Sequence, residues 1–213
     1  MGIPVSDILK RLDDLMSDDE RIRWSQDERI RWINDAGREL VLRRPAARAL
    51  TQHLTLVAGT LQRTPEGTAQ LLDVVRNIKA NGSAGSVIRI TDRQIMDDAN
   101  PDWHSMRAST THHYMQDDRT PTTFYVYPPA VEGSVVEVLL AVPPPPVSAA
   151  TDEIDMRAEF IGPIIDWCLY RMHSKDSEYS QGAVAMQHYS AFADAIGSPA
   201  AAAIQNSAKA NSL

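Results

Sequence analysis

The stretch that decides the fold is residues 122–146, which read Thr-Thr-Phe-Tyr-Val-Tyr-Pro-Pro-Ala-Val-Glu-Gly-Ser-Val-Val-Glu-Val-Leu-Leu-Ala-Val-Pro-Pro-Pro-Pro. Side chains alternate along it, and β-branched and aromatic residues dominate, which is typical of β-strands. The pattern predicts strands over 122–128 and 134–142. A turn at Gly133 is expected to join them as a hairpin.

Prolines bound both predicted strands. Pro128-Pro129 is expected to stop the first strand, because proline has no N–H to donate to a ladder. The four prolines of 143–146 can lie in neither a strand nor a helix interior, so they predict an extended polyproline II connection. The chain after this connection is predicted to be helical.

The alternating pattern extends back from this stretch to Leu50. Glycine-containing segments separate its strands, and Asn81-Gly82 is a strong hairpin signal. One helix is predicted within the region, over 92–99. The predicted strands are 50–57, 70–78, 86–90, 111–116, 122–128 and 134–142.

Helical spacing of apolar residues governs the chain on either side of the β region. Ser6 is expected to cap the first helix. Ser25 and Glu28 form a capping box for the second, and Pro45 ends it. The predicted helices are 7–16, 26–44, 157–174 and 177–196.

Three further segments have predicted roles. Gly37 lies in the middle of a predicted helix, where glycine costs up to about 1 kcal/mol relative to alanine, so a close crossing with another helix is expected there. Asp18-Asp19-Glu20 is predicted to be a solvated acidic turn. Residues 198–213 carry no apolar face large enough to fold alone.

These patterns predict an α+β fold. Neither helical pair buries its apolar stripe easily by itself, so we expect one four-helix bundle built from both ends of the chain, with an inserted antiparallel β domain and an extended C-terminal arm. The predicted parts are the N-terminal helices 1–48, the β domain 49–146, the C-terminal helices 147–197 and the tail 198–213.

Composition narrows the class of protein. The chain has 213 residues, of which 43% are hydrophobic and 23% charged, an ordinary globular balance. A single cysteine, Cys168, excludes an intramolecular disulfide. No secretory signal or membrane span is expected. The formal net charge is −7, whereas a protein that wraps nucleic acid is usually basic.

Motifs that carry chemistry are missing from the sequence. It has no phosphate-binding glycine loop, no paired Cys-x-x-Cys, no His-Glu-x-x-His and no Gly-x-Ser-x-Gly. We therefore predict no catalytic, cofactor-binding or metal-binding residues, and no enzyme. Asp117-Asp118 and Asp97-Asp98 leave one alternative open, because a pair of carboxylates can serve a glycosidase.

Aromatic and basic residues suggest contacts instead. Trp103, Tyr125 and Tyr127 can stack a base or a sugar, but we favour a role at a seam between subunits. Arg43 and Arg44 belong to a local basic patch. This patch is either solvated surface charge or a salt-bridged subunit contact.

Five motifs in order, spread over residues 5–197, resemble the head-to-tail adaptor (connector) proteins of tailed bacteriophages. They are Trp32-Ile-Asn-Asp-Ala-Gly-Arg-Glu-Leu40, Leu71-Leu-Asp-Val-Val-Arg-Asn77, Pro101-Asp-Trp-His104, Phe124-Tyr-Val-Tyr-Pro-Pro129 and Tyr170-Arg-Met-His-Ser-Lys-Asp-Ser-Glu-Tyr179. Residues 198–213 match no pattern of this family that we can name.

The resemblance implies a structural virion protein without enzymatic activity or cofactor, made in the host cytoplasm. It implies a dodecameric ring between the portal and the tail that continues the channel for DNA ejection. The helices and the C-terminal segment are expected to bind the portal, and the β domain to face the next tail or nozzle component. Genomic DNA is expected to pass without sequence-specific binding. Expected portal contacts are Ala200, Ile204, Gln205, Lys209 and Leu213.

Two alternatives stay open. The first is a tail-tube or neck component, which differs from an adaptor only in its position among the stacked rings of the virion. A virion-associated peptidoglycan hydrolase is the enzyme to consider, because some phage adaptors with related roles have such activity.

Overall fold

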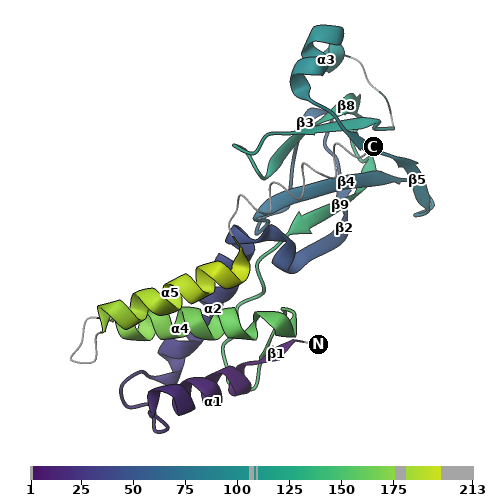
Figure 1. The fold of residues 1–213 in the computed structure, drawn as a ribbon. Coiled ribbons are helices and arrows are strands. Elements are labelled where there is room, and N and C mark those ends of the chain that lie inside the picture. Colours follow the sequence, from purple (N-terminus) through teal and green to yellow (C-terminus); the bar gives the residue numbers. More distant parts are fainter. Residues whose placement is uncertain (1, 106–107, 109, 176–180, 198–213) are drawn as a thin grey trace. The chain divides into compact units, whose positions relative to one another are not determined.

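The computed structural model describes residues 2–105, 108, 110–175 and 181–197. Across these residues the fold is mixed α+β, with five α-helices and mostly antiparallel sheets. The chain divides into two compact units (Figure 1). The helical unit comprises the chain up to Arg48 and from Pro143 onward, and the β unit comprises Ala49–Val142.

Four of the described α-helices belong to the helical unit: α1 (Val5–Met16), α2 (Gln26–Arg43), α4 (Ile161–Ser174) and α5 (Gly182–Ile196). Helix α4 packs against the other three. Its predicted apolar stripe is inward, since Ile164, Cys168 and Met172 have no exposed surface. The short elements of this unit are η1 (Pro45–Arg48), η3 (Ala158–Phe160) and an antiparallel pair of β1 (Ile3–Pro4) and β10 (Glu153–Ile154).

The two predicted N-terminal caps have different outcomes. Ser25 caps α2 as predicted, because its hydroxyl accepts the backbone N–H of Glu28 at 3.4 Å. The cap at Ser6 is wrong, since α1 begins at Val5, with Pro4 in the capping position and no side-chain cap. The pairing of β1 explains the earlier start, because it holds the chain extended up to Pro4.

Gly37 makes a close approach, but not the predicted one between two helices. A Cβ atom built on Gly37 lies 2.8 Å from Cγ of Pro144. The proline stretch therefore runs directly over this point of α2. Just beyond it, Asn34 binds both backbone groups of Val147, donating to the carbonyl at 2.9 Å and accepting the N–H at 2.8 Å.

The predicted solvated turn after α1 is wrong in one residue. Asp18 is only 7% exposed. Its carboxylate accepts the backbone N–H of Ile22 at 3.0 Å and pairs with the guanidinium of Arg29 at 2.6 Å. Arg29 is fully buried and also pairs with Asp13. A buried guanidinium needs such partners, which is why the turn folds inward over α2.

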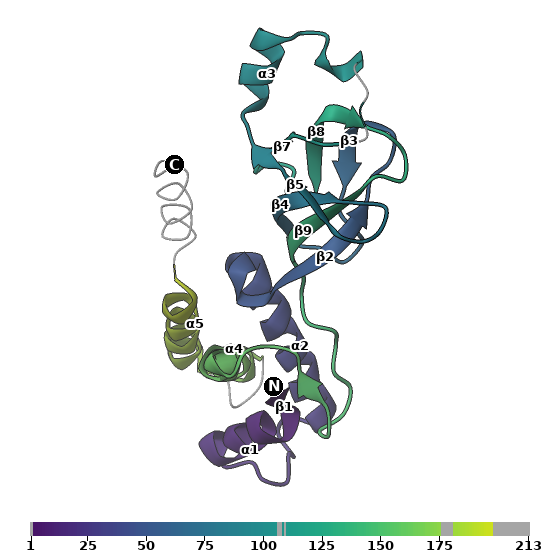
Figure 2. The same ribbon diagram turned by 90° about the vertical axis from the view of Figure 1, so that its right-hand side faces the viewer.

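The β unit contains two four-stranded sheets, drawn in Figures 1 and 2. The first sheet has the order β2 (Ala49–Thr55), β9 (Val135–Ala141), β4 (Gln70–Ile78), β5 (Ala84–Val87). The second has the order β3 (Gly59–Arg63), β8 (Thr123–Ala130), β7 (His113–Gln116), β6 (Arg89–Ile90). Buried residues of both sheets form one core cluster. All pairs are antiparallel except β6 with β7.

The predicted hairpin between the two strands of 122–142 is wrong. β8 belongs to the second sheet and β9 to the first, so the chain crosses from one sheet to the other between them. The alternation itself is confirmed, because Phe124 and Val126 are buried, as are Val136 and Val138. These apolar faces meet across the core, whereas a hairpin sets its two strands side by side in one sheet.

Two other predictions in this unit need correction. β3 was not predicted, because it is short and alternates around the polar Gln62, which is buried with its amide bonded to Val57 and Gly59. Pro128-Pro129 do not stop β8, which continues to Ala130. The register between β3 and β8 shifts at this point, and a register shift is where a strand tolerates proline.

Two further signals are confirmed, whereas the predicted strand 86–90 is wrong, because it is divided between β5 of the first sheet and β6 of the second. β4 and β5 form a hairpin around Asn81-Gly82, with Gly82 at φ 79°. The predicted helix over 92–99 is α3 (Arg93–Ala99), in which Asp92 caps the N–H of Gln94 at 2.6 Å.

We predict that Arg29→Met lowers the free energy of unfolding by roughly 3–5 kcal/mol, because it leaves the buried carboxylate of Asp18 without its cation and leaves Asp13 with Arg21 as its remaining partner. The matched control is Arg11→Met, which removes an exposed ion pair with Asp7 and should cost less than about 1 kcal/mol. Urea unfolding followed by far-UV circular dichroism measures both. Equal losses in the two variants would contradict the role of Arg29.

The same network sets an acid limit. Burial of Asp18 opposes its ionisation, but hydrogen bonds from the backbone of Arg23, Trp24 and Ile22, together with Arg29, outweigh burial and lower its pKa below the ordinary 3.8. A lowered pKa gives stability that is present above the ordinary value and lost as the pH falls through the folded value. Asp18→Asn should therefore reduce the amount by which the free energy of unfolding falls at acid pH.

Candidate functional site

The motif Pro101-Asp-Trp-His104 builds an aromatic cluster in the β unit, where it forms η2 (Trp103–Ser105). The indole of Trp103 is fully buried, and its N–H donates to the carboxylate of Asp97 at 2.9 Å. His104 stacks on the indole with ring centroids 3.7 Å apart. Its Nδ1 lies 2.9 Å from the hydroxyl of Thr60 on β3. These contacts anchor the segment after α3 to the second sheet.

Tyr125 and Tyr127 complete the cluster. Both project from β8 on the face opposite the buried Phe124, and both are half-buried. Their ring centroids lie 6.2 and 6.3 Å from that of Trp103, in edge-to-face geometry. The structure thus brings together the three aromatic residues that the sequence singled out. Trp103 has no exposed surface, so it cannot touch another molecule itself. It can support such a contact only by positioning the aromatic residues that pack against it.

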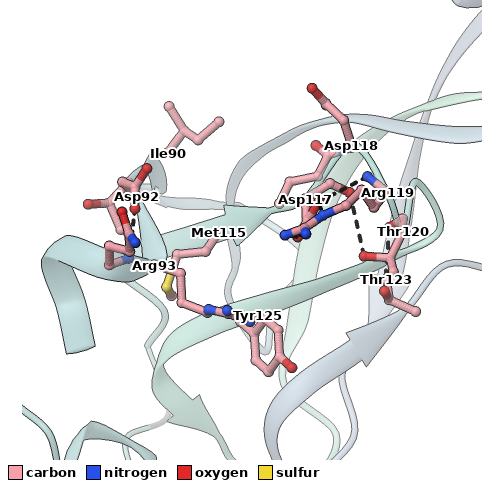
Figure 3. Close-up of a pocket in the computed structure, with 13 residues that line it drawn as sticks. Ile90, Asp92, Arg93, Met115, Asp117, Asp118, Arg119, Thr120, Thr123 and Tyr125 are labelled. Atoms are coloured by element: carbon pink, nitrogen blue, oxygen red, sulfur yellow. Dashed lines mark hydrogen bonds and ion pairs between the residues drawn. The ribbon is translucent and has the colours of Figure 1, made fainter.

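A pocket of about 810 Å³ lies beside this cluster, and Tyr125 belongs to both (Figure 3). The start of α3 forms one wall with Asp92 and Arg93. The end of β7 and the turn after it form the opposite wall, with Asp117 and Arg119. The pocket therefore lies entirely within the β unit and is mostly lined by polar side chains.

The two arginines that line the pocket are both paired with carboxylates. Arg119 pairs with Asp117 at 2.7 Å, and its hydrogen bond lowers the pKa of that carboxyl to about 2. The guanidinium of Arg93 lies 5.9 Å above the ring of Tyr125 and 3.7 Å from Asp97. The lining holds three aspartates and two arginines, so it carries an excess of one negative charge.

This electrostatic arrangement bears on the glycosidase alternative. A glycosidase needs one carboxyl with a raised pKa as proton donor, whereas the pKa of Asp117 is lowered. Within the described ranges, no group of three or more His, Cys, Asp or Glu side chains could hold a metal ion. What the pocket offers is hydroxyl, amide and paired ionic groups, which suit contacts with a polar surface.

The predicted basic contacts lie in the helical unit. Arg43 bonds to Glu39 at 3.2 Å, and its guanidinium lies 5.5 Å from the ring centre of Tyr189 on α5. Arg44 lies 5.7 Å from the ring centre of Phe160. Both side chains thus make contacts within their own unit, and their role between subunits stays a prediction. The predicted portal contacts Ala200, Ile204, Gln205, Lys209 and Leu213 lie outside the described residues.

The pocket was not predicted from the sequence. Asp92 was predicted only as the start of a helix, and Asp117 only as part of a carboxylate pair. Residues about 25 positions apart along the chain form its two walls. Pairing of β6 with β7 brings them together, and the sequence carried no signal for that parallel pair.

These features define the class of protein: a two-unit α+β chain that carries an aromatic cluster and a polar pocket in its β unit. No helix among the described residues is long and apolar enough to cross a membrane. A family model for the SU10 adaptor protein matches residues 3–212, so the chain belongs to that family. The match confirms the resemblance to the head-to-tail adaptors of tailed bacteriophages. Comparison with curated proteins finds no match.

We predict that Trp103→Ala releases the segment around α3, because the mutation removes a fully buried indole and costs roughly 3–5 kcal/mol. Hydrogen exchange measured by mass spectrometry should show faster exchange of the α3 amides. The control is Ile95→Ala on the same helix, since Ile95 is 62% exposed. Unchanged protection of α3 in the Trp103 variant would mean that the cluster is not its anchor.

Proposed function

We propose that the protein is a structural virion protein that joins the portal to the tail as one subunit of a ring. The observation that carries this proposal is the family match over nearly the whole chain, residues 3–212. The proposed ring is a dodecamer, as the resemblance to head-to-tail adaptors implies. It continues the DNA channel and takes part in tail assembly and DNA ejection.

The division into two units supports a two-sided role. The helical unit carries both chain ends, and the β unit is inserted between Arg48 and Pro143. In the proposal, the four helices act as one bundle that meets the portal, with residues 198–213 as an arm that binds it. The β unit faces the next tail or nozzle component. Its pocket and the aromatic pair Tyr125 and Tyr127 are available for contacts between subunits or with that component.

The charge of the chain suits a passage for DNA. Each subunit has a formal net charge of −7. Repeated around a ring, negative charge repels the phosphate backbone, so the DNA slides without specific binding. Asp117 does not fit the proton donor of the hydrolase alternative, because its pKa is lowered.

The test is portal binding by the chain truncated after Gly197. We expect at least a tenfold loss of affinity, equivalent to about 1.4 kcal/mol, because the proposed arm is removed. Circular dichroism should show that the truncated chain still unfolds cooperatively, so that a loss of affinity does not reflect a loss of the fold. If the truncated chain binds portal as tightly as the full-length chain, residues 198–213 are not a portal-binding arm. If the full-length chain does not bind portal, the proposed place in the virion is wrong.

The matched control is Asp117→Ala/Asp118→Ala in the β unit. It should keep the full affinity for portal, because neither residue belongs to the proposed portal-binding part. The same variant tests the alternative activity in a peptidoglycan lysis assay. Lysis by the parent chain that disappears in this variant would favour the hydrolase.

A further inference from the structure

The first sheet has an edge strand, β2, that lacks the features which usually prevent pairing with another strand. Among the described residues β2 pairs with β9 alone, so it is the outermost strand (Figure 2). It runs for seven residues, Ala-Leu-Thr-Gln-His-Leu-Thr, without a charge or a proline. Its register with β9 is continuous, without a bulge. Natural sheets usually guard an exposed edge with lysine, proline or a bulge, because unpaired backbone groups invite another strand.

The backbone groups at this edge can be identified. The N–H of Leu56 donates to the carbonyl of Ser134 at 2.7 Å, so Leu56 points toward the strand that pairs with β2. Backbone groups alternate sides along an antiparallel strand. Those of Thr51, His53 and Thr55 therefore point to the free edge. The side chains of the same three residues are exposed.

The opposite edge of the same sheet is also uncharged, although it is shorter and its register with β4 shifts between Arg76 and Ile78. It is β5, which consists of Ala-Gly-Ser-Val without a charge, and Val87 at its end is 69% exposed. The second sheet differs, because both of its edge strands carry arginine: β3 ends in Arg63, and β6 is only Arg89-Ile90. Charge thus protects the edges of the second sheet, whereas neither edge strand of the first sheet carries a charge.

We infer that the first sheet continues from one copy of this chain into the next, with β2 of one copy paired to β5 of its neighbour. The inference rests on the ring of the proposed function. A contact between two different edges is heterologous and repeats around a ring, whereas β2 paired with β2 closes a dimer. Backbone hydrogen bonds supply the affinity in such strand addition. The four residues of β5 set the length of the new ladder.

Engineered disulfides test the pairing directly. Three exposed β2 residues are changed to cysteine in turn, each together with Val87 on β5. The double variants are Thr51→Cys/Val87→Cys, His53→Cys/Val87→Cys and Thr55→Cys/Val87→Cys. The native Cys168 has no exposed surface and does not compete. Mild oxidation of the full-length protein should give a ladder of covalent multimers from at least one double variant, and only monomers from each single variant.

The single variants separate the two kinds of contact. Covalent dimers from His53→Cys alone mean that β2 pairs with β2, which overturns the inference. Native mass spectrometry of the same samples, with and without portal protein, tells whether rings form. Rings without a covalent ladder overturn the strand pairing but leave the proposed function intact. The absence of rings in both samples overturns the proposed ring itself.

A charge placed at the edge gives an independent readout. His53→Lys puts a cation on β2 and should raise the protein concentration needed for ring assembly at least tenfold. His112→Lys makes the same change at another exposed histidine of the β unit, next to β7 in the second sheet, and should leave assembly unchanged. Equal behaviour of the two variants would count against the β2 edge.

Discussion

The helical unit is built from two segments of the chain that the β unit separates, and the rest of the structure depends on the contacts that hold these two segments together. Asn34 binds both backbone groups of Val147, 113 positions further along the chain. Arg48, the last residue before the β unit, donates to the carbonyl of Pro143, the first residue after it, and pairs with Asp155 at 2.5 Å. Closing so long a loop costs entropy that these bonds and the helix contacts must offset. The arrangement lets one chain carry two units that each have a core of their own.

Two separate cores suit the proposed adaptor, in which one unit binds the portal and the other binds a tail component. In the helical unit, the buried Arg29 ties α1 and the turn after it to α2 through Asp13 and Asp18. In the β unit, the aromatic cluster around Trp103 holds the segment that forms one wall of the pocket. The chain belongs to the SU10 adaptor family. In the proposed ring, each of the two units has its own binding partner. The open edge of the first sheet then becomes a joint between subunits.

Sequence patterns predicted the elements better than the way they assemble. Alternation identified the buried faces of β8 and β9, because it reports which side chains avoid water. It does not tell whether two successive strands lie side by side or face to face, so the hairpin at Gly133 was wrong. Burial of Asp18 depends on Arg29, 11 positions away, and acidic runs usually remain solvated. Of the candidate site, the sequence singled out its aromatic residues, whereas the pocket depends on a parallel strand pair that left no local signal.

The most direct test of the two-sided adaptor is lysine cross-linking of intact virions, because lysines divide cleanly between the units. Lys79 is the single lysine within Ala49–Val142, whereas Lys10 and Lys175 lie in the helical unit, and all three are exposed. The account predicts cross-links from Lys10 or Lys175 to portal and from Lys79 to a tail component. Cross-links from Lys79 to portal, or no association of the chain with virions, would contradict it.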